Sequence, residues 1–325
     1  MITKSLFAKR DGVRRHAPKL IGALALAAAG LLAACGGGTA IEPFKPTRIV
    51  VFGDESSVIT SDGRKYTVNA LNSTTNAIDC ASNPLWIQSL ATTFGLVFAE
   101  CNTGNVAAPT GKIYAAVGAK VADVKAQIEG FLATESVNSK TLLTVMAGAN
   151  DILELYAQYP LQSEDTLKTQ AAERAAVLAQ QVNRLADAGG RIILPTVPDM
   201  GLTPFALSEN TSKADANRSK LLSALTLAFN NALTLKVTLD GRQLGVVLAD
   251  EMVQSIAKYP TYYGYANVVD AACLDSVTLP NCTSSTMVSN ASITTWLWAT
   301  PKLLSPAGQA RLGTLAQYRA QNNPF

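Results

Sequence analysis

The residues that could do chemistry gather in three short polar segments, each of which follows an apolar run. They are residues 52–57 (FGDESS), 147–151 (AGAND) and 195–201 (PTVPDMG). They supply carboxylates, hydroxyls and a side-chain amide, the groups used in acid–base, nucleophilic and oxyanion chemistry. A hydroxyl nucleophile also needs a base, and imidazole usually fills that role because its pKa lies near neutrality.

Histidine is the missing group. The only histidine is His16, and it lies within a leader of the signal-peptide type: residues 1–19 carry six Lys or Arg and one Asp, and residues 20–34 are apolar. We expect residues 1–34 to be a signal peptide that is removed on export. The mature chain then has no histidine and cannot run a conventional Ser-His-Asp triad.

The leader ends in Leu-Ala-Ala-Cys at residues 32–35, which resembles a bacterial lipobox. Such a sequence predicts that Cys35 is acylated and becomes the mature N-terminus, with residues 35–45 as a flexible tether. Gly36, by resemblance to sorting in Gram-negative bacteria, favours the outer membrane. The alternative is a plain secretory signal with an incidental cysteine. The apolar run is shorter than the roughly 20 residues that a transmembrane helix needs, so we expect none to be retained.

Removal of the leader changes the charge balance. Six of the 27 basic and one of the 24 acidic residues lie in residues 1–34, which leaves 21 basic and 23 acidic residues and a net charge of −2. No Lys/Arg cluster remains, so we expect no nucleic-acid partner.

The four remaining cysteines predict two local disulfides, Cys80 with Cys101 and Cys273 with Cys282, in a compartment that permits them. Four cysteines allow three connectivities. A metal site is a weak alternative because no histidine and no CxxC spacing is present, and we expect neither a metal nor another cofactor.

Buried-strand patterns alternate with helical periods. The strands are expected at residues 48–53, 141–148, 191–197 and 243–250, and the helices at 84–94, 121–134, 164–188 and 212–239. Gly189 and Gly190 are expected to stop the third helix. This alternation predicts one α/β domain over residues 46–325, in which the working residues follow the carboxyl ends of parallel strands. Residues 259–295 show no clear period and are expected to form a disulfide-tied loop.

Six segments, in order, resemble the GDSL, or SGNH, family of esterases and lipases, especially its secreted and autotransporter-passenger branch. They are RIVVFGDES, YAAVGAKVADV, VMAGANDI, RIILPTVPDMGLTP, YGYANVVDAAC and WLWATPKLLSPAGQARL. The resemblance implies a three-layer α/β/α sandwich of the flavodoxin-like type and ester hydrolysis. It also implies that Gly118 and Asn150 donate N–H groups to an oxyanion.

The triad positions of that family are all altered. Glu55 stands at the nucleophilic serine, Thr300 at the aspartate and Leu303 at the histidine. Leucine cannot transfer a proton, so the inherited mechanism fails on residue type.

Two alternatives stay open at this point. A one-residue slip would make Ser56 the nucleophile, with Lys302 as base; otherwise Ser56 caps a helix and Lys302 is solvated. Glu55 would be an anion held by Gly118 and Asn150 at a helix N-terminus, or would turn outward into water. Asn150 and Asp151 would bind a ligand or only hold a loop.

These residues predict a membrane-anchored lipoprotein without catalysis, a pseudoenzyme that binds an acyl chain, a glycan or a partner protein in the former active-site cleft. The alternative is an ester hydrolase that uses Ser56.

Overall fold

A five-stranded parallel sheet organises residues 43–325, the part of the chain that the computed structural model describes. The predicted signal peptide, Cys35 and the tether up to residue 42 lie outside the described residues. The strand order is β4-β1-β5-β6-β7. The bounds are β1 (Arg48–Gly53), β4 (Gly111–Ile113), β5 (Thr141–Met146), β6 (Arg191–Pro195) and β7 (Leu244–Val247).

The register of this sheet brings the polar segments together. β1 lies in parallel beside β5 with Gly53 opposite Met146, and β5 lies beside β6. The chain therefore leaves β1, β5 and β6 at the same edge, as parallel topology requires. Residues 54–57, 147–151 and 196–201 follow there.

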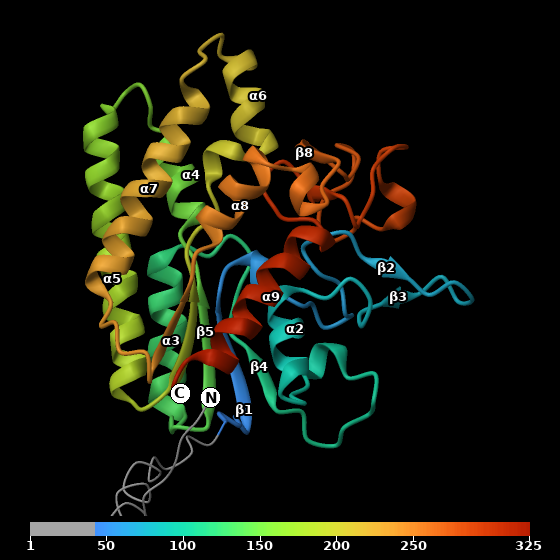
Figure 1. Cartoon of the computed structure of the whole chain (residues 1–325), viewed down its shortest axis with the longest axis vertical. Coiled ribbons are helices and arrows are strands. Elements are labelled where there is room, and N and C mark those ends of the chain that lie inside the picture. The colour runs from blue at the N-terminus through green and yellow to red at the C-terminus, as the bar shows by residue number, and fades with distance from the viewer. Residues whose placement is uncertain (1–42) are drawn as a thin grey trace, which may run out of the picture. The chain divides into compact units, whose positions relative to one another are not determined.

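Helices cover both faces of the sheet (Figure 1). Alternate strand residues enter two separate cores: Val50 and Phe52 enter one, and Ile49 and Val51 the other. The first core is closed by α3 (Val121–Thr134), α4 (Ala149–Tyr156), α5 (Glu164–Asp187), α6 (Pro204–Ser212) and α7 (Arg218–Lys236). The second is closed by α2 (Trp86–Thr93), α8 (Ala249–Lys258) and α9 (Pro306–Asn322). The predicted three-layer α/β/α fold is confirmed.

The predicted helices agree with the structure to different degrees. α3 has the predicted bounds. α5 ends at Asp187, one residue before the predicted end at residue 188, and Gly189 after it adopts φ +96°. The predicted helix over residues 212–239 is wrong. Ser212 ends α6, and Ala214 adopts a left-handed φ of +50° that breaks the path before α7 begins.

Both predicted disulfides, Cys80–Cys101 and Cys273–Cys282, are present. The segment over residues 259–295 is not wholly irregular, contrary to the expectation. It contains β8 (Asn267–Ala271), which pairs in parallel with β9 (Trp296–Trp298). A second small sheet joins β2 (Ala70–Leu71) to β3 (Ile78–Asp79).

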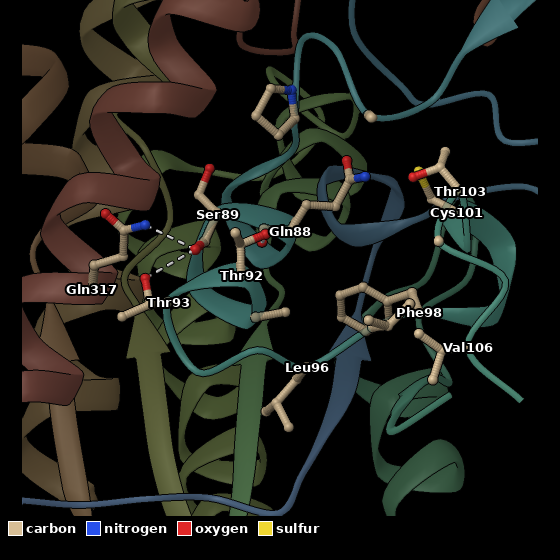
Figure 2. A pocket seen from close by; sticks show the side chains of 15 residues that line it. Gln88, Ser89, Thr92, Thr93, Leu96, Phe98, Cys101, Thr103, Val106 and Gln317 are labelled. Carbon is tan, nitrogen blue, oxygen red and sulfur yellow. Dashed lines mark hydrogen bonds between the residues drawn. The ribbon is translucent and has the colours of Figure 1, made fainter. Parts of the chain in front are cut away.

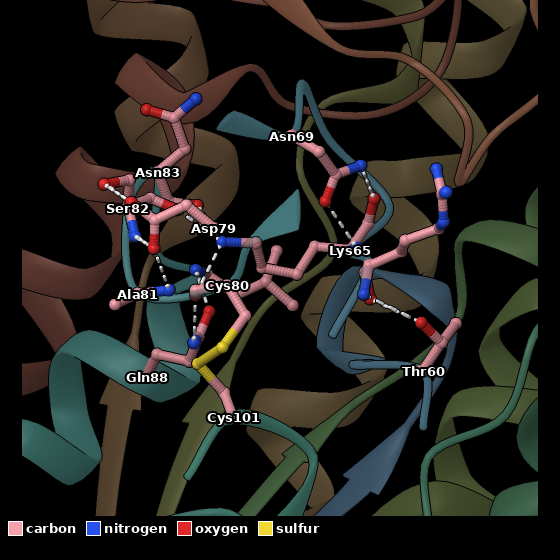
Figure 3. Close-up of a disulfide and its surroundings, with 12 residues drawn as sticks. Thr60, Lys65, Asn69, Asp79, Cys80, Ala81, Ser82, Asn83, Gln88 and Cys101 are labelled. Atoms are coloured by element: carbon pink, nitrogen blue, oxygen red, sulfur yellow. Dashed lines mark hydrogen bonds between the residues drawn. A yellow bond between two sulfur atoms is a disulfide. The ribbon is translucent and has the colours of Figure 1, made fainter. Parts of the chain in front are cut away.

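Lys65 fixes the loop that precedes α2. Its side chain is fully buried, and Nζ donates to the carbonyl oxygens of Cys80, Ser82 and Asn83 at 2.9, 2.5 and 2.9 Å. Figure 3 shows this side chain reaching the segment beside the Cys80–Cys101 disulfide. An ammonium has three donors, so the three carbonyls satisfy it fully.

Within residues 43–325, no helix has both the length and the apolar composition needed to cross a membrane.

Candidate functional site

The end of β1 presents three consecutive polar residues, Asp54, Glu55 and Ser56. Gln127 of α3 holds Gly53 at this point: its Oε1 accepts from Gly53 N at 3.0 Å and its Nε2 donates to Gly53 O at 3.1 Å. The chain then makes a 3-10 turn, η1 (Glu55–Ser57). Asp54 caps this turn, because its Oδ1 accepts from Ser56 N at 2.9 Å.

Two expectations about this turn are wrong. Ser56 does not cap a helix, since Asp54 does so and Ser56 lies inside the turn. The turn also has only three residues. It therefore lacks the aligned peptides that would give a helix N-terminus its field.

Glu55 points inward, onto the two groups that the resemblance assigns to an oxyanion. Its Oε2 accepts from Gly118 N at 2.8 Å and from Asn150 Nδ2 at 3.0 Å. Gly118 has φ +71°, a conformation that side chains rarely adopt, and this aims its N–H at the carboxylate. The outward orientation is not the one observed.

Asn150 and Asp151 have different roles. Asn150 contacts Glu55 and also donates to Ala119 O at 3.2 Å, so it holds the Gly118 loop as well. Asp151 is buried, and its Oδ2 accepts from Val121 N at 2.9 Å at the start of α3. Its Oδ1 lies 3.3 Å from Arg174 Nη1. Asp151 is therefore a loop-holding residue.

Asp54 is the residue that sequence reasoning overlooked. Burial and, next in size, the neighbouring Glu55 carboxylate together raise the pKa of Asp54 to about 7. Its position in the GDES segment was visible in the sequence, but its complete burial was not.

The other two triad positions form a tight turn that closes the site. Thr300 Oγ1 accepts from Leu303 N at 3.2 Å, and Ala299 N donates to Leu303 O at 2.8 Å. Leu303 lines a small cavity together with Asp54, Ser56 and Trp298, whereas Thr300 does not. That cavity has about 20 Å³, space for about one water molecule. The former cleft is nearly closed.

The Ser56–Lys302 arrangement is not assembled in the described residues. Both residues line the small cavity, yet no hydrogen bond joins them. Lys302 is exposed, and its Nζ lies 4.7 Å from the centre of the Phe205 ring. No group of three or more His, Cys, Asp or Glu side chains within residues 43–325 is placed to hold a metal ion.

A larger pocket of about 550 Å³ lies elsewhere, between α2, the loop after it and Gln317 of α9. Figure 2 shows that Thr93 and Gln317 both donate to the carbonyl oxygen of Ser89 there. No acidic or basic side chain lines this pocket, so it offers no group for acid–base chemistry.

Comparison with known proteins identifies a family and relatives for this chain. The family model for GDSL-like Lipase/Acylhydrolase matches residues 49–278 and ends before the turn that holds Thr300 and Leu303. "Lipase 1" of Photorhabdus luminescens is 30% identical over 197 residues, 58% of this chain and 27% of that protein. A GDSL esterase/lipase of Arabidopsis thaliana is 25% identical over 142 residues, 42% of this chain and 37% of that protein. The matched regions thus span 27% and 37% of these relatives.

Solved structures with a similar fold include a lipolytic G-D-S-L family protein from Veillonella parvula, at 12% identity and a TM-score of 0.39, covering 84% of this chain and 95% of that one. An acetylxylan esterase from Geobacillus stearothermophilus has 15% identity and a TM-score of 0.40, covering 85% and 95%. The chain belongs to the GDSL-like lipase/acylhydrolase family.

Proposed function

We propose that this chain is a non-hydrolytic member of its family, an exported lipoprotein that binds a ligand instead of cleaving one. The observation that carries the proposal is the contact of Glu55 Oε2 with Gly118 N and Asn150 Nδ2 at 2.8 and 3.0 Å. A carboxylate on these two donors occupies the place where a tetrahedral oxyanion would be stabilised.

The missing base supports the same conclusion. Nucleophilic attack by a hydroxyl needs a group that takes its proton and later protonates the leaving group. Leu303 at the histidine position has no such group, and residues 43–325 contain no histidine. Ser56 has no hydrogen-bonded base among the described residues.

The space for a ligand lies beside the former cleft. A groove of about 980 Å³ is bounded by α6, the disulfide-tied segment and Pro301. Its lining is about equally apolar and polar: Leu207, Val269, Leu274 and Val288 are its aliphatic side chains, and Asp270 and Asp275 are among its polar residues. Among the three ligand classes expected, an acyl chain or an apolar protein segment would use the four aliphatic side chains, and the acyl chain is tested first.

The first experiment measures hydrolysis of activated aryl esters with short and long acyl chains. The chain from residue 36 is compared with Glu55→Ser, Ser56→Ala and, as a matched control, the exposed Ser139→Ala. We expect no turnover above the protein-free rate in any of them. Glu55→Ser restores a hydroxyl at the nucleophile position but supplies no base. Turnover that Ser56→Ala abolishes and Ser139→Ala preserves would establish the hydrolase alternative instead.

The binding half is measured on the same preparation with a fluorescent long-chain fatty acid as probe. We expect saturable binding that Leu274→Asp weakens at least about tenfold, because a charge in place of one of the groove's aliphatic side chains opposes burial of the acyl chain there. Leu161→Asp is the control, since Leu161 is 94% exposed and outside the groove. Equal effects of the two substitutions would place the acyl site elsewhere.

The lipid anchor is tested separately. Mass spectrometry of the full chain extracted from bacterial membranes should show an acylated N-terminal Cys35, and Cys35→Ser should release the chain into the soluble fraction. A mature N-terminus at any other residue would contradict the anchor.

A further inference from the structure

The described unit begins at the edge of the sheet opposite the site. The ring of Phe44, just before β1, lies 5.2 Å from that of the C-terminal Phe325 and 5.8 Å from that of Phe94. Figure 1 shows the start of β1 and the end of α9 together at the lower edge, while α6 and β8 lie at the upper one. Whatever precedes Pro43 is therefore attached at the edge where the strands start.

Two strongly exposed leucines lie at this same edge. Leu235 in the last turn of α7 is 82% exposed, and Leu239 in the following loop is 70% exposed. The loop is tied to the C-terminus, because Gly241 O accepts from Asn323 Nδ2 at 3.1 Å. Neither leucine contributes to the cores, so the fold gives no reason for an apolar side chain at either position.

Exposed lysines accompany the leucines. Lys45 lies two residues before Thr47, whose N donates to Lys140 O at 2.9 Å, so Lys45 and Lys140 are neighbours on this edge. Lys236 lies between the two leucines in the sequence. All three lysines are exposed, and none is within ion-pair distance of a carboxylate in residues 43–325.

We propose that Leu235, Leu239, Lys45, Lys140 and Lys236 form a membrane-contact face that lies on an anionic phospholipid bilayer. Leucines that enter the interface and lysines that remain near phosphate groups are the combination that such a surface binds. A second copy of the chain is a poor occupant. A symmetric pair across this face would bring these unpaired lysines together, and like charges at an interface repel.

The proposal rests on the lipid anchor of the proposed function and adds the orientation of the domain. Cys35 precedes Pro43 by eight residues. That is a reach of at most about 29 Å when fully extended. A tether this short, attached at the membrane-contact face, directs the site at the opposite edge of the sheet, with Glu55 and Gly118, away from the bilayer.

The experiment uses the chain from residue 36, which lacks the anchor and retains the whole compact unit Pro43–Phe325. It is sedimented with vesicles of phosphatidylcholine alone or with phosphatidylglycerol in a 7:3 mixture. We expect binding to the anionic vesicles that falls with added salt. Both Leu235→Ser/Leu239→Ser and Lys45→Gln/Lys140→Gln/Lys236→Gln should weaken it at least about tenfold.

Leu161→Ser is the matched control, an exposed leucine in the turn between α4 and α5, and it should leave vesicle binding unchanged. Absence of binding to anionic vesicles, or an equal loss in the control, would overturn the membrane-contact face. So would a dimer in light scattering that Leu235→Ser/Leu239→Ser dissociates, because a second copy would then cover this face. The anchor is judged by the mass of Cys35, so the two ideas can fail independently.

Discussion

Glu55 and Lys65 are two charged side chains, ten residues apart, that are each held by protein groups of opposite polarity. Glu55 is half-buried, and one of its oxygens accepts from a backbone N–H and a side-chain amide. Lys65 is fully buried, and its ammonium donates to three backbone carbonyls. Both charges are held by neutral hydrogen-bonding groups of the protein. The two environments differ in the state of those groups when the charge is removed.

The fold depends on the charge of Lys65 more than on that of Glu55. The carbonyls of Cys80, Ser82 and Asn83 converge on Lys65. Removal of the lysine leaves the part-buried carbonyls of Ser82 and Asn83 without a donor, which is costly, whereas Cys80 O keeps its hydrogen bond from Gln88 Nε2. Gly118 N and Asn150 Nδ2 lie at a half-open edge, where water can replace the carboxylate. The Lys65 cage therefore serves the fold, whereas the donors around Glu55 form an anion site that the fold does not need to have occupied.

The largest expected effect is on Lys65. Lys65→Met keeps the apolar stem and removes the ammonium, so we expect a loss of about 3–5 kcal/mol in the free energy of unfolding. Urea denaturation followed by circular dichroism measures it, with the exposed Lys140→Met as control. A loss below about 1 kcal/mol would show that water replaces the ammonium, and the contrast with Glu55 would disappear.

Asp54 gives the next effect, and its sign is unusual for an acid. Its pKa is raised from 3.8 to about 7 in the fold, because burial and then the Glu55 carboxylate disfavour its charged form. The fold binds a proton there that the unfolded chain releases. The stabilisation from Asp54 is thus fully present below pH 3.8 and is lost as the pH rises through about 7.

Asp54→Asn removes this titration and retains an acceptor for Ser56 N. Relative to the variant, the wild type should lose about 3–4 kcal/mol of unfolding free energy between pH 4 and pH 8. Urea midpoints at several pH values measure the difference, which also cancels the carboxylates common to both proteins. Parallel pH profiles would mean that Asp54 titrates alike in the folded and unfolded chains.

The fold could be predicted from the sequence where the residue types themselves indicate burial. The runs RIVVFG and TLLTVM are apolar throughout, as strands covered on both faces must be, and they became β1 and β5. β4 has three residues, too few to separate from a loop. α8 begins at Ala249, inside the strand predicted over residues 243–250, so its start was assigned to the strand. The break between α6 and α7 at Ala214 could not be predicted, because no glycine or proline lies there.

The candidate site could be predicted in part for a different reason. Glu55, Gly118 and Asn150 each belong to a recognisable segment, and parallel topology brings such segments to one edge of the sheet. The sequence therefore predicts that Glu55 either contacts Gly118 and Asn150 or turns outward into water. The Lys65 cage could not be predicted. Lysine is ordinarily exposed, and its three partners are backbone carbonyls, which leave no signature in residue type.

The smallest effect is expected at Glu55 itself. Glu55→Gln keeps an acceptor for Gly118 N and Asn150 Nδ2 but loses the charge that strengthens both hydrogen bonds. It also removes the repulsion from Asp54, because the Glu55 carboxylate is the second-largest cause of the raised Asp54 pKa. These two changes oppose each other, so we expect a change in unfolding free energy within about 1 kcal/mol.

The pH at which Asp54 titrates should fall below about 7 in Glu55→Gln. The pH profile of unfolding free energy of Glu55→Gln, compared with that of Glu55→Gln/Asp54→Asn, measures this shift. A loss comparable with that of Lys65→Met would show that the Glu55 carboxylate is needed for stability. Its contact with Gly118 N and Asn150 Nδ2 would then be a folding interaction and not an anion site that the fold can leave empty.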